Sequence, residues 1–298
     1  MNKNLLIAEN IVKQFGDYTA LNHVNLEIPE GSIFGLLGPN GAGKTTFMRI
    51  INQIIAHDSG SLIFDGNLLK REDIVKIGYL PEERGLYKKM KVGEQALYLS
   101  KLKGMPHNEA LEKLKFWFKK LDILDWWNKK VEELSKGMAQ KIQFVVTVIH
   151  EPKLLIFDEP FSGFDPINAA IIRNEILDLS KKGTTIILST HRMESVEEIC
   201  NNIALIDKGE CILQGNIEKI KNDFRNNSFL VDIQTENLSL PESFEIISKV
   251  EKEYQILIKD NASANDLLKA LLPNGEIISF KEKIPTMEEI FIKTIKNE

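Results

Sequence analysis

Cysteine is scarce in this chain. Only Cys200 and Cys211 occur among 298 residues, and their separation matches no metal-ligand spacing. A disulfide framework is therefore excluded, and both side chains are expected to be reduced thiols. Long apolar runs are also missing, because the longest, such as residues 144–149, fall far short of the roughly 20 residues that span a bilayer. The amino-terminal segment (MNKNLLIAEN) likewise lacks the apolar core of a signal peptide.

An excess of positive charge is absent as well. The chain has 38 Lys and Arg against 43 Asp and Glu, which gives a formal net charge of −5. This balance provides no overall basic surface for nucleic-acid phosphates, so no nucleic-acid partner is expected. The hydrophobic share of 43% is ordinary for a globular protein. The sequence therefore predicts a soluble, intracellular chain of one large or two modest domains, and any membrane channel would belong to another chain.

A glycine-rich run at residues 38–46 (GPNGAGKTT) contains the phosphate-loop pattern. The apolar segment 32–37 before it predicts a buried strand, and the apolar spacing of 46–55 after it predicts a helix. In this context Lys44 is expected to reach the β- and γ-phosphates, and Thr45 to bind Mg²⁺. The residues expected to surround the phosphates are Gly38, Pro39, Asn40, Gly41, Ala42, Gly43, Lys44, Thr45 and Thr46.

Two carboxylates follow a second apolar run at residues 154–159 (LLIFDE). This pattern predicts a buried parallel strand that delivers acids at its carboxyl end. Asp158 is expected to hold Mg²⁺, and Glu159 to act as general base toward the attacking water. A phosphate loop with such a strand is still compatible with GTPases, kinases, helicases and transporter ATPases.

A third motif lies between these two, at residues 134–141 (LSKGMAQK), just before an apolar helical stretch. Here the chain resembles the ATP-binding cassette (ABC) family, whose signature loop usually reads LSGGQ. Ser135 and Gly137 match that loop, whereas Lys136 and Met138 depart from it. A plain helix N-cap is the alternative reading of Ser135, and the two readings are compatible. The resemblance implies that Ser135 and Gly137 meet the γ-phosphate bound by an opposing subunit, in a homodimer or heterodimer that sandwiches two ATP molecules.

The same resemblance assigns roles to three further residues. It implies that Phe15 stacks on adenine, that Asp165 contacts the partner's site, and that His191 donates a hydrogen bond to the γ-phosphate. Two of these residues have a structural alternative: Phe15 as a core residue, and His191 as the polar end of a strand.

Glu82, in residues 77–87 (IGYLPEERGLY), departs from the family pattern. It stands where most members have a glutamine that approaches Mg²⁺ and the attacking water, in a loop that links the nucleotide to the membrane subunit. The resemblance gives Glu82 a metal-binding and catalytic role, although a solvated turn is the alternative. A carboxylate still accepts from metal-bound water, but it adds negative charge beside the triphosphate.

The segment around Glu82 and the LSKGM motif together resemble bacterial sodium-efflux (NatA-like) exporters. That group implies an ATPase with ATP and Mg²⁺ as cofactors, which powers separate integral membrane subunits from the cytoplasmic face of the cell membrane. Soluble cassette ATPases that act on ribosomes or DNA are the alternative class. They usually carry two cassettes or a long coiled coil, neither of which is visible here. A sensor with a degenerate site is a third option, which the intact Lys44, Asp158, Glu159 and His191 oppose.

The predicted fold is α/β, a P-loop NTPase of ABC type with a parallel core sheet, an N-terminal antiparallel β subdomain and a helical subdomain. Residues 1–215 are expected to form the nucleotide-binding domain, with the helical part at about 88–150 and helical periodicity over 91–127. Residues 216–298 are expected to form a small α+β accessory domain. Its predicted elements are strands at 229–234, 254–258 and 276–281 and helices at 263–272 and 286–295.

Overall fold

A computed structural model describes residues 3–82, 85–190, 192–235, 237–259 and 262–296. The chain divides into two units, Met1–Ile217 and Glu218–Glu298. The predicted domain boundary, between residues 215 and 216, lies two residues before this division. Each unit is described by itself.

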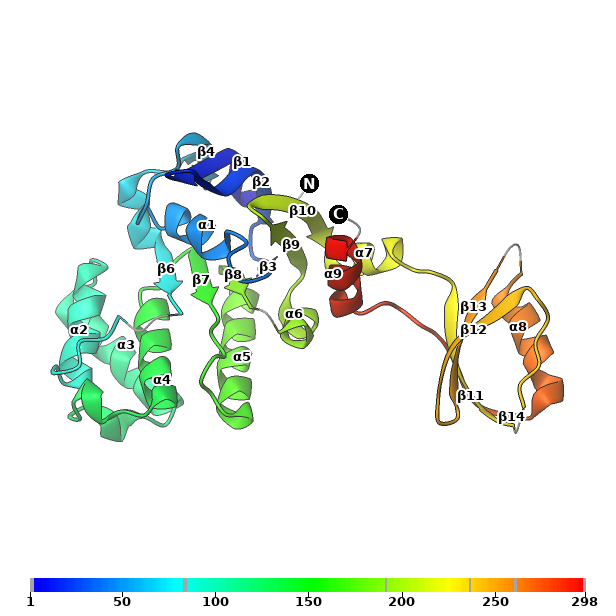
Figure 1. Cartoon of the computed structure of the whole chain (residues 1–298). Helices are drawn as coiled ribbons and strands as arrows, with labels where there is room; N and C mark the ends of the chain where they lie inside the picture. Colours follow the sequence, from blue (N-terminus) through cyan, green and yellow to red (C-terminus); the bar gives the residue numbers. More distant parts are fainter. Residues whose placement is uncertain (1–2, 83–84, 191, 236, 260–261, 297–298) are drawn as a thin grey trace. The chain divides into compact units, whose positions relative to one another are not determined.

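A mixed six-stranded sheet forms the centre of the first unit (Figure 1). Three of its strands, at residues 33–37, 154–158 and 185–189, are rich in Ile, Leu and Phe and buried along their length, as expected for strands covered on both faces. The order is β10-β9-β3-β8-β7-β6, and all neighbours are parallel except β9 and β10. The strands are β3 (Ile33–Leu37), β6 (Ile77–Leu80), β7 (Leu154–Asp158), β8 (Thr185–Ser189), β9 (Asn202–Asp207) and β10 (Glu210–Asn216).

A second, antiparallel sheet has the order β2-β1-β4-β5. It comprises β1 (Asn4–Phe15), β2 (Tyr18–Pro29), β4 (Ser59–Phe64) and β5 (Asn67–Leu68). The predicted N-terminal antiparallel β subdomain is thus confirmed, although the individual strands β4 and β5 were not predicted.

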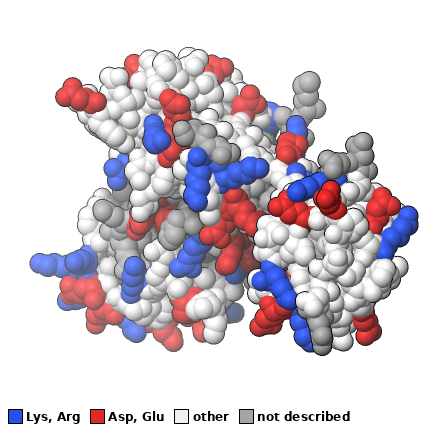
Figure 2. All heavy atoms as spheres, turned by 45° about the vertical axis from the view of Figure 1, so that its right-hand side comes forward, with Lys and Arg blue, Asp and Glu red and all other residues white. Residues whose placement is uncertain are grey.

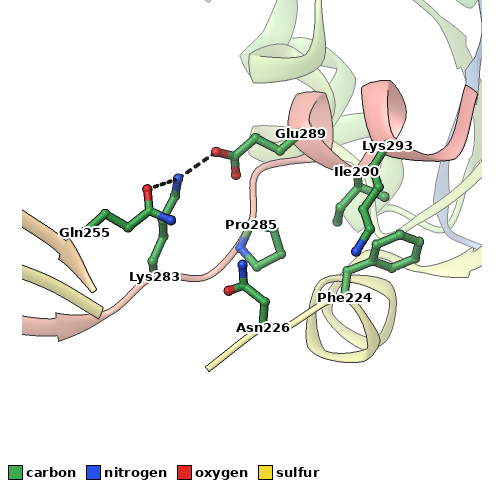
Figure 3. Close-up of a pocket in the computed structure, with 8 residues that line it drawn as sticks. All are labelled: Phe224, Asn226, Gln255, Lys283, Pro285, Glu289, Ile290 and Lys293. Carbon is green, nitrogen blue, oxygen red and sulfur yellow. Dashed lines mark hydrogen bonds and ion pairs between the residues drawn. The ribbon is translucent and has the colours of Figure 1, made fainter. Parts of the chain in front are cut away.

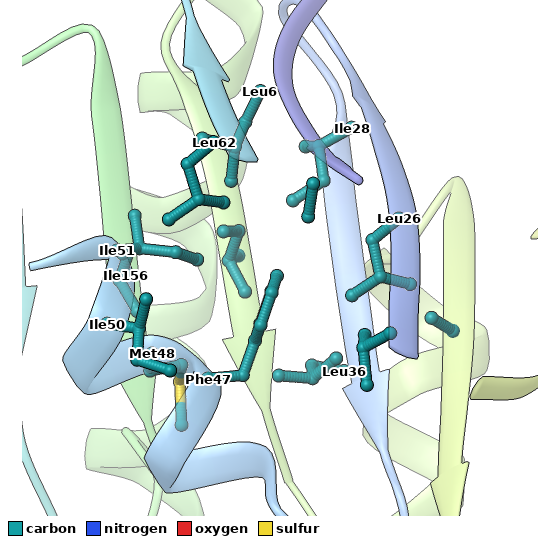
Figure 4. Close-up of a cluster of buried hydrophobic side chains, with 14 of the residues drawn as sticks. Leu6, Leu26, Ile28, Leu36, Phe47, Met48, Ile50, Ile51, Leu62 and Ile156 are labelled. Carbon is teal, nitrogen blue, oxygen red and sulfur yellow. The ribbon is translucent and has the colours of Figure 1, made fainter. Parts of the chain in front are cut away.

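Helix α1 (Lys44–Ile51) packs between the two sheets. It begins two residues before, and ends four residues before, the predicted helix at 46–55. Figure 4 shows Phe47 and Ile51 of α1 pointing into the space that Leu62 and Leu36 also fill from the two sheets. Burying each such side chain contributes roughly 1.5–3 kcal/mol. This shared core fixes the start of α1, and with it the phosphate loop, relative to both sheets.

Three helices gather beyond β6 and β7: α2 (Val92–Leu102), α3 (His107–Lys120) and α4 (Lys136–Val148) (Figure 1). The helical pattern predicted over 91–127 is interrupted, because the chain turns at Gly104, whose φ is +84°. Helices α5 (Pro166–Lys181) and α6 (Met193–Ile199) follow β7 and β8.

Aromatic side chains join these helices to the central sheet. The Phe144 ring on α4 stacks on Phe157 of β7 with centroids 5.7 Å apart, and Trp117 of α3 meets Phe144 edge-on at 5.9 Å. The Phe118 and Trp127 rings meet at 5.2 Å. For Trp117 and Trp127, packing is therefore the structural role.

The second unit is α+β, as predicted. Its antiparallel sheet has the order β12-β13-β11-β14, and α8 packs on one face through Leu267 and Leu271. Strand β12 was not predicted. The elements are α7 (Ile217–Asp223), which begins at the last residue of the first unit, β11 (Ser228–Gln234), β12 (Phe244–Val250), β13 (Glu253–Ile258), α8 (Ala264–Leu271), β14 (Glu276–Glu282) and α9 (Met287–Lys296).

The surface shown in Figure 2 carries acidic and basic side chains interspersed among uncharged ones. Within the described ranges, none of the helices combines the length and the apolarity that crossing a bilayer requires.

Candidate active site

A cavity of about 460 Å³ opens at the carboxyl ends of the central strands. It is bounded by the β1–β2 turn, by the loop between β3 and α1, and by the ends of β7 and β8. The lining residues are Phe15, Tyr18, Ala20, Asn40, Gly41, Gly43, Lys44, Thr45, Thr46, Glu82, Asp158, Glu159 and Ser189.

The loop before α1 requires glycine at two positions. A Cβ at Gly38 would lie 2.1 Å from the carbonyl oxygen of Ile206, and one at Gly43 would lie 2.6 Å from that of Ala20. Gly38, Gly41 and Gly43 also have positive φ angles of 145°, 81° and 111°. This path brings the loop directly into the first turn of α1, whose amide groups have no acceptors within the helix.

Lys44 is folded back over this loop. Its Nζ donates to the carbonyl oxygens of Gly38 and Pro39, both at 2.8 Å. Burial lowers the pKa of Lys44, while the carboxylates of Glu159 and Asp158, together with Glu82, act in the opposite direction. The lysine therefore already lies beside the position that a phosphate chain would take along the loop.

Asp158 lies at the floor of the cavity and is 3% exposed. Ser189 Oγ donates to its Oδ1 at 2.8 Å, and Thr45 Oγ1 donates to its Oδ2 at 3.2 Å. Burial raises the pKa of Asp158, and the charges of Glu82 and Glu159 add to that rise. The site thus concentrates negative charge on one side of Thr45, where a cation would be favourable.

Glu159 turns away from β7 in the left-handed region, with φ of 50°. Such a conformation costs about 1–3 kcal/mol and persists only where neighbours hold it. Here the Glu159 amide donates to Ser189 O at 3.0 Å, and Thr190 Oγ1 donates to Glu159 Oε2 at 3.3 Å. The turn brings this second carboxylate to the cavity wall beside Asp158.

The residues present fit a nucleoside triphosphate with Mg²⁺. Phosphate oxygens suit the amide groups at the start of α1 and the Lys44 ammonium. The part of the chain that the structure describes contains no group of three or more His, Cys, Asp or Glu side chains that could hold a metal ion by itself. This agrees with Mg²⁺ chemistry, since that ion is usually held by one or two carboxylates together with substrate phosphates. Thr45 and Asp158 are the residues that would hold it, with Glu82 nearby.

The structure brings most of the predicted site residues together, but not all. Phe15, Glu82 and the phosphate loop line one cavity with Asp158 and Glu159. Gly38, Pro39 and Ala42 do not line the cavity, although the first two accept hydrogen bonds from Lys44. His191 lies outside the described residues.

Ser135, Gly137 and Asp165 do not line this cavity. Ser135 is the exposed N-cap of α4, and its Oγ accepts from the Met138 amide at 3.3 Å. Asp165 caps α5 by accepting from the Asn168 amide at 2.9 Å. Gly137 lies close to the segment before α5, since a Cβ on it would be 3.5 Å from Gly163 O. These residues form a separate surface made of two helix N-termini.

Three lining residues, Tyr18, Ala20 and Ser189, were not among the predicted site residues. Ser189 ends β8 and is the register partner of Asp158 on β7, so an alignment of the two strand ends indicates it. Tyr18 faces Phe15 across the β1–β2 turn.

A cavity of about 220 Å³ in the second unit offers no comparable chemistry (Figure 3). Its Lys283 Nζ is paired with Glu289 at 2.8 Å and donates to Gln255 at 3.1 Å. Lys293 lies over the Phe224 ring at 5.6 Å. The cavity lacks a phosphate loop and has a single carboxylate, which is already paired.

The fold and the cavity define a P-loop ATPase of the ABC class, with its α1 loop, strand-end acids and separate helical part. Comparisons with known proteins agree. The family described as "ABC transporter" matches residues 21–162, and "ATP-binding protein DrrA1-3-like, C-terminal domain" matches residues 215–295. A further match, described as "AAA domain, putative AbiEii toxin, Type IV TA system", covers residues 128–197 within the same cassette region.

The match to individual relatives covers from two thirds to nearly all of this chain. The uncharacterized ABC transporter ATP-binding protein YhaQ of Bacillus subtilis (strain 168) is 41% identical, with 98% of both chains covered. NatA and the linearmycin resistance ATP-binding protein LnrL of the same organism are each 36% identical, covering 67% and 71% of this chain and 83% and 69% of their own. A solved structure, "Structure of ATP binding subunit of ABC transporter", is similar with a TM-score of 0.69 and 26% identity, covering 74% of this chain and 93% of that one. The chain belongs to the ATP-binding subunits of ABC transporters, which are ATP-hydrolysing, membrane-associated proteins.

Proposed function

We propose that this subunit powers export, with two copies closing on ATP at the cavity described above and opening after hydrolysis. The observation that supports it best is the convergence of Lys44, Thr45, Asp158 and Glu159 on one cavity. These are the residue types that phosphoryl transfer requires for positioning and charge neutralisation.

The positions of the lining residues around the cavity support the roles proposed for them. Lys44 would exchange its two carbonyl acceptors for β- and γ-phosphate oxygens, and Thr45 and Asp158 would hold Mg²⁺, which would supply charge neutralisation when bound. Glu159 accepts a proton from the attacking water, because its carboxylate lines the cavity next to Asp158. Phe15 provides the stacking surface for adenine, and His191 is proposed to contact the γ-phosphate. Glu82 adds a third carboxylate near the metal site.

Dimer formation is proposed because Ser135, Gly137 and Asp165 lie outside the cavity of their own chain. Ser135 and Asp165 begin two helices, and helix N-termini favour anionic groups such as phosphates. A second copy, identical or related, would bring these termini to the γ-phosphate that the first copy binds.

A groove of about 330 Å³ is the proposed contact for the membrane subunit. It lies between β6 and helices α2 and α4, and Leu102, which lines it, is 63% exposed. A partner segment with an apolar face would fit it, because exposed apolar surface of this kind is typical of protein–protein contact sites.

Export from the cytoplasmic face and the sodium-efflux grouping are proposed from relatives. LnrL is named for linearmycin resistance, and NatA shares 36% identity with this chain. Residues 1–215 would then be the nucleotide-binding domain, with its helical part at about 88–150, and 216–298 an accessory domain. Transport assays in membrane vesicles of both orientations test the direction.

Substitution of Glu159 tests the core of the proposal. The Glu159→Gln variant should bind ATP with unchanged affinity and dimerise with it. Its rate of ATP hydrolysis should fall at least about 100-fold, as loss of a general base predicts. Glu132→Gln, on an exposed turn outside the cavity, is the matched control and should leave turnover unchanged. Normal turnover by Glu159→Gln would remove Glu159 as the base, and failure of the unmodified chain to bind ATP would refute the proposal itself.

A further inference from the structure

Two aromatic side chains face the cavity from the turn between β1 and β2. Phe15 and Tyr18 are register partners, and they are 50% and 57% exposed although both line the cavity. Large aromatic rings are seldom left in water beside a pocket unless a ligand covers them. Phe15 already has a proposed role as the adenine platform. Tyr18 has none.

The Tyr18 hydroxyl reaches the phosphate loop. It donates to the carbonyl oxygen of Gly41 at 3.1 Å. Gly41 has φ of +81°, and a Cβ there would meet no atom within 4 Å, so side-chain packing does not hold this part of the loop. The Tyr18 hydroxyl is therefore a specific tie between the turn that carries Phe15 and the tip of the loop.

Other carbonyl groups of the loop are held in the same way. Lys44 Nζ occupies those of Gly38 and Pro39, and the Gly209 amide donates to Ala42 O at 3.0 Å. Because these carbonyl oxygens already accept hydrogen bonds from the protein, they do not compete with phosphate oxygens for the amide donors of the loop. On binding, however, Lys44 exchanges its carbonyl acceptors for phosphate, whereas Tyr18 can keep Gly41.

We propose that Tyr18 is a nucleotide-positioning residue that connects recognition of the base to recognition of the phosphates. This inference rests on the proposed function, since it assumes that the cavity takes a nucleoside triphosphate. Stacking of a base on Phe15 restrains the turn, and the hydrogen bond from the Tyr18 hydroxyl then restrains Gly41 as well. The loop is then better organised for a phosphate chain that bears a base than for a bare one.

Calorimetric binding of ATP and of inorganic tripolyphosphate to the full chain tests this. Tyr18→Phe keeps the ring and removes the hydroxyl, so the Kd of ATP should rise about 2- to 10-fold, as for loss of one neutral hydrogen bond. The Kd of tripolyphosphate should rise by a smaller factor, because this ligand brings no base to restrain the turn. Phe15→Ala should weaken ATP alone. For ATP, the double variant should lose less than the product of the two single losses, because each substitution breaks the same connection.

Two further measurements separate positioning from a structural role. Amide hydrogen exchange at residues 41–43 should accelerate in Tyr18→Phe, while the melting temperature stays unchanged. Tyr98→Phe, on α2 and outside the cavity, is the matched control and should alter neither ligand's Kd.

The inference is overturned if Tyr18→Phe binds ATP as the unmodified chain does, if it weakens the binding of ATP and of tripolyphosphate by the same factor, or if the two single losses multiply for ATP. If the unmodified chain binds neither ligand, the proposed function fails and this inference fails with it. The two failures are distinguishable because the first leaves ATP binding by the unmodified chain intact.

Discussion

Ser135 is the N-cap of α4 and also a residue proposed to meet the nucleotide of a second copy. Substitutions can separate these two roles. Ser135→Ala removes the capping oxygen, whereas Ser135→Asp keeps an oxygen that can accept from the Met138 amide. Aspartate also suits the positive end of a helix.

The magnitudes follow from the cap geometry. The Ser135–Met138 bond is long, at 3.3 Å, so its loss should cost about 0.5–1 kcal/mol, at the lower end for N-caps. For a unit of this size, that corresponds to a fall in melting temperature of roughly 1–4 °C. Ser135→Asp should melt at the temperature of the unmodified chain or slightly above. Both variants should lose ATPase activity, with Ser135→Asp falling about 100-fold or more, because a carboxylate would face the partner's triphosphate.

The assay combines light scattering with nucleotide titration in the Glu159→Gln background, where hydrolysis is suppressed. Glu159→Gln alone should form a dimer with ATP. Adding Ser135→Asp should abolish the dimer but leave the Kd of the single chain for ATP unchanged, since Ser135 does not line its own cavity. If the double variant still dimerises with ATP, or if Ser135→Asp alone turns over at the normal rate, the reasoning about a shared site is wrong.

Two other predictions concern stability. Gly43→Ala should lower the free energy of unfolding by about 2–4 kcal/mol in urea titrations, because φ is +111° and the new Cβ would lie 2.6 Å from Ala20 O. Gly41→Ala, where φ is +81° and the new Cβ meets open space, should lower it by only about 1–2 kcal/mol. Equal losses in the two variants would contradict the steric argument. Burial and the charges of Lys103 and Lys113 lower the pKa of His150 to about 4 from 6.5. As the pH falls, the unfolded chain therefore binds this proton before the folded chain does. The free energy of unfolding should then fall by at most about 3 kcal/mol between pH 6.5 and pH 4. His150→Gln should show a smaller loss over the same range, and an identical pH dependence of urea midpoints would refute this account.

The elements most accessible from sequence were those with a strong local pattern. Strands β7 and β13 and helices α8 and α9 lie within two residues of their predicted bounds, because apolar alternation and caps mark them locally. Strand β12 escaped prediction because only Phe244 of its seven residues is buried, which leaves no alternation to read. The break at Gly104 was missed because helical spacing continues on both sides of it.

The site shows the same limit. The phosphate loop and the acids of β7 were readable because glycine, lysine and carboxylate at fixed spacing carry the chemistry themselves. Tyr18 and Ser189 were not, since each acts through a pairing with a residue distant in sequence: a hydrogen bond from Tyr18 to Gly41, and a strand register between Ser189 and Asp158. Such pairings depend on the tertiary fold, which the local sequence pattern around each residue does not reveal.

Gly163 lies shortly after Glu159, and the Lys136 side chain rests against it: a Cβ at Gly163 would be 2.8 Å from Lys136 Cε. The backbone leaving one catalytic carboxylate therefore touches the helix start that, in the proposed dimer, serves the opposite nucleotide. Packed groups cannot move independently at such distances. Release of phosphate at one site would consequently displace residues at the other site through van der Waals contact. The two nucleotide sites of the assembly would therefore not work independently.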